Sequence, residues 1–290
     1  MSIWLAVGDE SGNWDALGGG TNGGQPLAVA LVAAPLQDWR DLETETLADG
    51  ESVADRLWQP LPLPEKYLAQ EKPDAAHHVM PALQWLKDQR LGGDWSLETP
   101  PATDEPAAVQ LWQHLRWLAR HRRFVSVGVQ APLDRVRARF GSDDPAQALG
   151  ALYGRLGAWL LPFLGADAEL HLSPGPRSEP ADSLAVRRVR VGNGSGARVH
   201  GDQRGLVSRA LDEARPALRR LGIDDDRLQA GTLGPLLQGQ GRLDFWLAGA
   251  VADLGAALVC AAHFPHYALH LDAAALRSVH VCDFDTLTGN

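Results

Sequence analysis

The chain has few cysteines and no excess of positive charge. Its two cysteines, Cys260 and Cys282, cannot build a disulfide framework in 290 residues, so a reducing, cytoplasmic setting is expected. The sequence does not open with a basic segment, an apolar stretch and a small-residue cleavage site, so no signal peptide is predicted. A net charge of −9 argues against a general DNA- or RNA-coating protein. It does not exclude a protein whose acidic site binds phosphate through metal ions.

What the chain does have is enough apolar material for a sizeable core. Hydrophobic residues make up 45% of it and charged residues 22%. We find no internal repeat and no low-complexity tract. The stretch 59–76 is rich in proline and polar residues, which predicts a long loop or an insertion within about 50–100.

The most informative segment is the N-terminal one. The apolar run 3–7 leads directly into Gly8, Asp9, Glu10 and Ser11. A short apolar run bounded by turn residues predicts a strand buried on both faces. Asp9 and Glu10 would then lie at the carboxyl end of a central strand, where open α/β sheets bind their ligands. The alternative is that the two carboxylates only begin a polar turn.

The remaining apolar segments alternate between strand and helix patterns. Expected strands cover 27–33, 124–129, 169–172, 185–191 and 279–284, and expected helices cover 36–47, 81–89, 103–119, 145–163, 202–218 and 245–262. The glycine-rich stretch 18–24 predicts a hairpin connection between the first two strands. This order of elements fits a mixed α/β sheet covered by helices.

Asp253 is the second carboxylate of interest, because it is the only charged residue between Asp244 and His263. A buried carboxylate is costly unless it is paired or binds a metal. The small residues around it, such as Gly249 and Gly255, would let the helix approach the sheet closely and bring Asp253 near the end of the first strand.

Other interpretations of this region stay open. Asp253 could cap a loop or bind a neighbouring side chain. A membrane span is disfavoured, because the stretch is rich in Gly and Ala and an Asp at its centre costs roughly 2.5–3.5 kcal/mol on insertion. The spacing of Cys260, His263, His266 and His270 would suit Zn²⁺ on a helix, but Pro265 interrupts one.

The sequence from Asp9 to Asn13, after an apolar strand, resembles the start of the family called domain of unknown function 3800. The segment from Ala252 to Leu254 is similar to the C-terminal helix of that family. The resemblance implies one RNase H-like domain over residues 1–290, α/β with a mixed sheet flanked by helices. It also implies a metal-dependent nuclease activity, with Asp9 and Asp253 holding Mg²⁺ or Mn²⁺ and Glu10 as a further ligand or an orienting group. Two ions about 3.5–4 Å apart would then serve phosphodiester hydrolysis.

The sequence departs from that family at one position. Ser173 follows the strand 169–172, where the resemblance leads us to expect a third carboxylate, and serine is a poor Mg²⁺ ligand. Either Glu169, Glu179 or Asp182 substitutes for it, or the site is degraded. We therefore expect a nuclease acting on nucleic acid, with a catalytically inactive scaffold in a larger protein assembly as the alternative. No membrane partner is expected.

Overall fold

The computed structural model describes the chain in segments. They are residues 2–12, 14–18, 26–42, 44–47, 50–58, 95–100, 106–141, 145–174, 188–190, 197–199, 203–231, 245–261, 269–270 and 278–289. Most of the expected insertion at 50–100 and all of the expected helix at 81–89 lie outside these segments.

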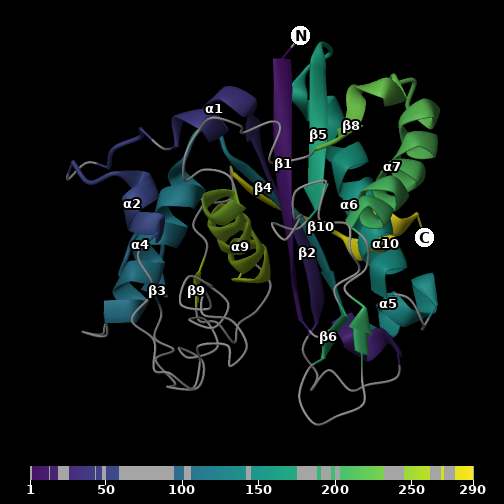
Figure 1. Ribbon diagram of the computed structural model, residues 1–290, viewed down its shortest axis with the longest axis horizontal. Helices are drawn as coiled ribbons and strands as arrows, with labels where there is room; N and C mark the ends of the chain where they lie inside the picture. Colours follow the sequence, from purple (N-terminus) through teal and green to yellow (C-terminus); the bar gives the residue numbers. More distant parts are fainter. Residues whose placement is uncertain are drawn as a thin grey trace.

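A six-stranded sheet forms the centre of the molecule (Figure 1). Its strands, from one edge to the other, are β10 (Val279–Cys282), β4 (Val125–Ala131), β2 (Leu27–Pro35), β1 (Ser2–Ser11), β5 (Ala168–Pro174) and β8 (Leu228–Ala230). β2 is antiparallel to both β1 and β4. β5 is parallel to β1, β8 is parallel to β5, and β10 is parallel to β4. The sheet is therefore mixed, and its neighbour pairing changes from antiparallel to parallel at β1.

The central strands form because their residues are apolar on both faces. Eight consecutive residues of β2, from Leu27 to Ala34, are buried. A strand covered on both sides is expected to read as such a continuous run rather than an alternating one. The predicted hairpin between the first two strands is confirmed, with Trp4 opposite Pro35 and Ser11 opposite Ala28.

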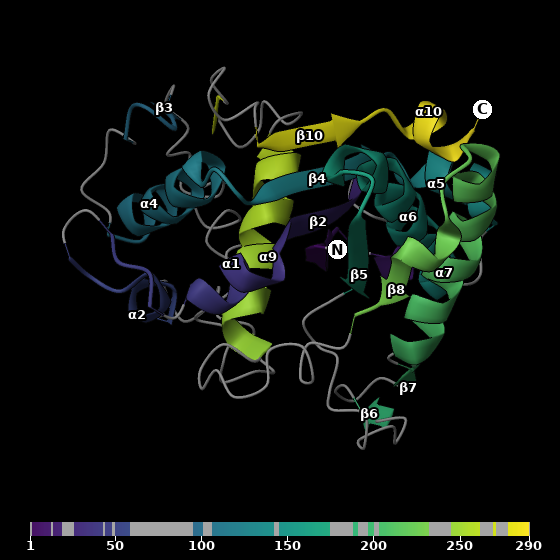
Figure 2. The same ribbon diagram turned by 90° about the horizontal axis from the view of Figure 1, so that it is seen from above.

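One face of the sheet is covered by α9 (Phe245–Ala261), which packs on β1, β2 and β4 (Figure 2). Behind α9 lie α4 (Pro106–Arg120) and α2 (Val53–Trp58), and α1 (Leu36–Asp41) packs beside β1. Glycines allow α9 to approach closely: a Cβ at Gly255 would lie 2.1 Å from Val32 Cγ2. The Trp39 indole also ties α1 to the sheet, donating to the Leu5 carbonyl at 2.9 Å.

The opposite face carries α6 (Pro145–Leu160) and α7 (Gln203–Arg220), so the molecule has three layers (Figure 2). α6 and α7 pack closely, since a Cβ at Gly154 would lie 2.0 Å from the Ala210 carbonyl oxygen. The same layer holds smaller elements. They are α5 (Leu133–Phe140), α10 (Phe284–Thr288), η1 (Trp14–Gly18) and η4 (Leu161–Leu164).

Short pieces complete the described structure. β3 (Trp95–Ser96) pairs with β9 (Leu269–His270), and β6 (Arg188–Arg190) forms a hairpin with β7 (Ala197–Val199). The 3₁₀ turn η5 (Asp225–Arg227) precedes β8. Among the described residues, no helix combines the length and the apolar character that crossing a membrane requires.

The expected α/β class with a mixed sheet flanked by helices is confirmed. Two elements differ from expectation. The helix expected over 36–47 ends at Asp41, where the Asp41 carbonyl accepts bonds from the Thr44 and Glu45 amides and the chain turns. Of the strand expected over 185–191, the described residues 188–190 form β6, which lies in a separate two-stranded sheet rather than in the central one.

Candidate metal centre at the end of strand β1

Asp9 and Glu10 lie near the carboxyl end of a central strand, as the sequence predicts. β1 has the antiparallel β2 on one side and the parallel β5 on the other. The last residue pair between β1 and β5 is Gly8 with Pro174, so Asp9 is one residue beyond the paired part of β5. Such a switch point, at the carboxyl ends of strands, is where open α/β sheets form ligand crevices.

The two adjacent carboxylates lie on opposite faces of the sheet. Side chains alternate along a strand. Leu5 and Val7 belong to the core on the α9 side, whereas Ala6 packs with the α6 side. Asp9 continues the α9 series and is partly buried, while Glu10 is exposed on the α6 side. The strand geometry thus separates Glu10 from Asp9, although the sequence suggests that both could serve one metal.

Glu10 has a partner of its own on α6. The Tyr153 hydroxyl donates a hydrogen bond to Glu10 Oε2 at 3.2 Å, across 143 residues of sequence. The Tyr153 ring is fully buried and packs directly on Gly8. A Cβ added to Gly8 would lie only 2.3 Å from Tyr153 Cε1. Burial first, and then the negative charges of Glu10 and Asp9, raise the pKa of Tyr153 well above its usual value. The phenol therefore stays protonated and remains a donor to Glu10.

Ser173 lies on the same face as Asp9, diagonally across the β1–β5 pair. It pairs with Val7 in the register of β1 and β5, and neighbouring paired residues point to the same face. Its side chain is only 1% exposed, and its hydroxyl has no hydrogen-bond partner among the described residues. A buried hydroxyl without a partner is unfavourable, so this position is expected to be satisfied by something else. It is a polar group beside Asp9, but not the carboxylate that the resemblance leads us to expect.

Asp253 lies on α9, the helix that covers this face, and is partly buried. Gly255 meets Val32 of β2, and Val259 lies against Gly128 of β4. At 3.6 residues per turn, Asp253 lies about 160° around the helix from Gly255. It therefore does not project straight onto the sheet between these contacts. The bridging of Asp9 and Asp253 by one ion stays a prediction.

The described residues contain one compact set of possible metal ligands, and it is elsewhere. Asp224, Asp225 and Asp226 have ligand atoms within 4.8 Å of one another. This set is explained as a turn: the Asp224 carboxylate caps η5 by accepting from the Asp226 amide at 3.0 Å. Asp225 pairs with Arg219 at 2.7 Å, which lowers the pKa of Asp225. Asp9, Glu10 and Asp253 do not form a set this compact.

Some residues considered from the sequence cannot be placed. His263 and His266 of the possible zinc set lie outside the described residues, as do Glu179 and Asp182. Glu169, the other possible substitute ligand, lies four residues before Ser173 on β5 and pairs with His171 at 2.7 Å. This contact is at the level of Leu5, because Leu5 is the register partner of His171, so Glu169 is well before the strand end.

Comparison with known proteins adds nothing to this site: no family profile, no curated protein and no solved structure matches the chain.

Proposed function

We propose that the protein is a divalent-metal-dependent nuclease with an RNase H-like sheet, and that its metal site is built on Asp9. The observation that carries the proposal is the surroundings of Asp9. This carboxylate lies at the end of a central strand, at the switch from antiparallel to parallel pairing, with the buried and unpartnered Ser173 hydroxyl beside it. A carboxylate is an oxygen ligand of the kind that Mg²⁺ and Mn²⁺ prefer, whereas the Ser173 hydroxyl is a poor ligand and would serve by hydrogen bonding to a water molecule of the ion.

The topology supports the same proposal. β4, β2 and β1 form an antiparallel series, and β5 and β8 continue it in parallel. α6 and α7 connect the later strands over one face, and α9 returns over the other. An RNase H-like sheet has this arrangement of strands and helices. β10 is an additional strand at the edge next to β4.

Each residue has its own part in the proposed site. Asp9 would hold the cation. Asp253 is the proposed second carboxylate and would reach the ion from the side of α9, because it does not project straight onto the sheet. A bound divalent cation supplies the polarisation of a phosphoryl oxygen and a lowered pKa for a water molecule. Glu10, on the other face, is held by Tyr153 and therefore acts by orienting the end of β1 rather than as a ligand.

A first experiment measures metal binding through stability. Clustered carboxylates repel one another, and a cation that binds only the folded state stabilises it. Mg²⁺ or Mn²⁺ should raise the melting temperature of the wild type, and Asp9→Asn and Asp253→Asn should remove that rise. Asp224→Asn is the matched control, because it changes a carboxylate of the exposed acidic turn. A metal response that persists in Asp9→Asn and disappears in Asp224→Asn would contradict the proposed site.

A second candidate function is a catalytically inactive RNase H-like scaffold within a larger assembly. The observation that favours it is Ser173, a neutral side chain beside Asp9. The two functions separate in a nuclease assay of the wild type, Asp9→Asn and Ser173→Asp on single- and double-stranded DNA and RNA. The nuclease predicts weak metal-dependent cleavage that Asp9→Asn abolishes and Ser173→Asp increases. The scaffold predicts no cleavage and no metal binding by any of the three.

A further inference from the structure

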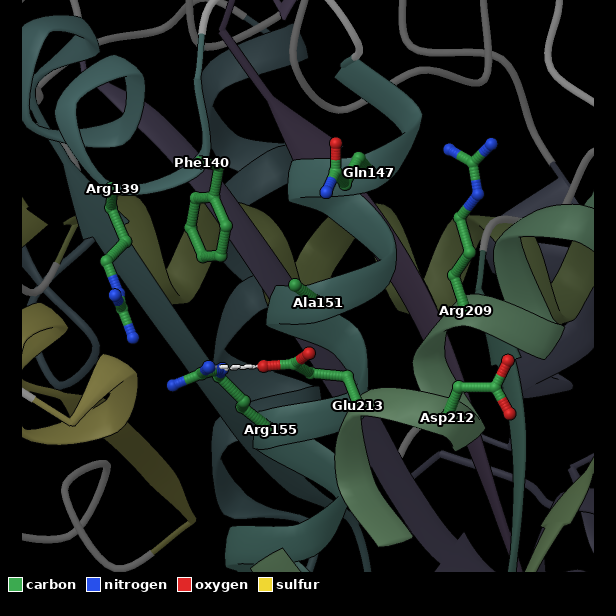
Figure 3. A pocket seen from close by; sticks show the side chains of 8 residues that line it. All are labelled: Arg139, Phe140, Gln147, Ala151, Arg155, Arg209, Asp212 and Glu213. Atoms are coloured by element: carbon green, nitrogen blue, oxygen red, sulfur yellow. Dashed lines mark hydrogen bonds and ion pairs between the residues drawn. The ribbon is translucent and has the colours of Figure 1, made fainter. Parts of the chain in front are cut away.

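A second candidate site lies in the other helical layer. α5, α6 and α7 border an open surface pocket of about 390 Å³, lined by side chains from all three helices (Figure 3). Pockets that bind small molecules start at roughly 300 Å³. This pocket is separate from Asp9, which faces α9 on the opposite side of the sheet.

The pocket is richer in arginine than the rest of the molecule. Three of its eight lining residues are arginines, Arg139, Arg155 and Arg209, whereas Lys and Arg together account for 27 of the 290 residues. Asp212 and Glu213 contribute two carboxylates, so the lining carries a net charge of +1 (3 − 2) in a protein of net charge −9. A local positive charge in an acidic protein favours an anionic ligand over other solutes.

Two of the arginines are held in place by the surrounding structure. Arg155 Nε donates to Glu213 Oε1 at 2.7 Å, and its Nη1 donates to the Leu287 carbonyl at 3.2 Å. Arg139 donates to the Thr288 carbonyl at the end of α10. A carbonyl orients a guanidinium without neutralising it, so Arg139 keeps its positive charge for a ligand. Glu213, in contrast, is already paired with Arg155.

The walls of the pocket are fixed by close helix packing. A Cβ at Gly150 would lie 2.8 Å from the Cβ of Arg209, and a Cβ at Gly154 would meet the backbone of α7. The helices therefore cannot separate or slide without losing these contacts. Figure 3 shows Arg139 and Arg209 on opposite walls, with Gln147 and Ala151 of α6 between them. The small side chain of Ala151 leaves the space that the pocket occupies.

The pocket also offers an aromatic surface. Phe140 lines it next to Arg139, and its ring is held by an edge-on contact with Phe284, with centroids 6.4 Å apart. A planar ligand group can stack on such a ring. Arginine guanidinium groups match the geometry of phosphate oxygens and bind them through paired hydrogen bonds. The Gln147 amide adds a donor and an acceptor for polar atoms of a ligand.

We propose that this pocket binds a small phosphate monoester that carries a planar ring, a molecule the size of a nucleoside monophosphate. Arg139 and Arg155, whose guanidinium groups lie on the same side of the pocket in Figure 3, bind the phosphate, and Phe140 with Ala151 contacts the ring. Arg209, on the opposite wall, adds positive charge to the lining. Charge, size and an aromatic wall are combined at one place, and each is needed for a different part of this ligand.

The test is calorimetric titration of the full chain with adenosine 5′-monophosphate, inorganic phosphate and adenosine, all in EDTA. EDTA removes divalent cations, so binding at the Asp9 site cannot contribute. We expect saturable binding of the monophosphate, weaker binding of phosphate alone, and no binding of adenosine. Phosphate binding as tightly as the monophosphate would refute the role of the aromatic wall. No saturable binding of the monophosphate at millimolar concentration would refute the site.

Variants locate the binding. Arg139→Gln should weaken monophosphate binding about ten-fold, because it removes a charge-assisted hydrogen bond. Arg209→Gln should weaken it less, because it removes only a positive charge from the opposite wall. Asp212→Asn should strengthen binding by removing a negative charge from the lining. Arg220→Gln, at the exposed end of α7, is the matched control and should leave the affinity unchanged. Ala151→Leu fills the pocket and should abolish binding, with circular dichroism checking that the variant is folded. Equal affinities across the four lining variants and the control would place binding elsewhere and overturn the proposal.

Discussion

The buried phenol of Tyr153 predicts a specific loss of stability at alkaline pH. Its pKa is raised well above the usual value of 10.0, by burial first and then by the charges of Glu10 and Asp9. Above pH 10 the unfolded chain releases this proton and the folded protein keeps it. A group that binds more protons in the folded state makes stability fall as pH rises. The free energy of unfolding should therefore drop by about 1.4 kcal/mol between pH 9 and pH 11 through this residue alone.

Tyr153→Phe isolates that effect, because phenylalanine keeps the ring on Gly8 and loses only the hydroxyl. At neutral pH the variant should be about 1 kcal/mol less stable, since it lacks the hydrogen bond to Glu10 and that carboxylate can recover water. The wild type loses this contribution of Tyr153 with rising pH and the variant has none to lose, so the difference between their stabilities should vanish near pH 11. Urea unfolding at several pH values measures the free energy of unfolding of both proteins. Parallel curves for the two proteins across this range would refute a buried, protonated Tyr153.

Three other residues give predictions about stability. His114 is buried in α4, and desolvation is the main reason why its pKa is lowered to about 4. The free energy of unfolding should therefore fall as pH drops from about 6.5 towards 4. His114→Leu should flatten this decrease in acid unfolding curves. Gly154→Ala should destabilise the protein by about 1–3 kcal/mol in urea unfolding, because the new methyl meets the backbone of α7. Ser173→Ala should leave the metal-free protein equally stable or raise its stability by about 1 kcal/mol, because it removes a buried hydroxyl without a partner; a large loss would mean that the hydroxyl is satisfied.

The central strand and its hairpin could be predicted from the sequence because their signals are local. A continuous apolar run ending in Asp9, and a glycine-rich connection before the next run, suffice to predict β1, β2 and their antiparallel pairing. The long helix α9 is predictable for the same reason. The short strand β8, with three residues, has no comparable signal, and its place beside β5 depends on contacts between distant segments.

The site was harder to predict because it depends on which face each residue takes. The alternation of side chains along β1 already implies that Asp9 and Glu10 point apart, once the strand is known to continue through both. The partner of Glu10 could not be predicted, since Tyr153 is 143 residues away and only the packing of α6 on Gly8 brings them together. The arginine pocket had no sequence signal either, because its residues come from three helices.

The most direct test of the metal site is a crystal soaked with Mn²⁺ and measured for anomalous scattering. Our account predicts an anomalous peak beside the Asp9 carboxylate at the end of β1, and no such peak in Asp9→Asn. The acidic turn at Asp224 provides an internal comparison, because it is the compact carboxylate set among the described residues. Manganese at that turn, with none at Asp9, would contradict the account.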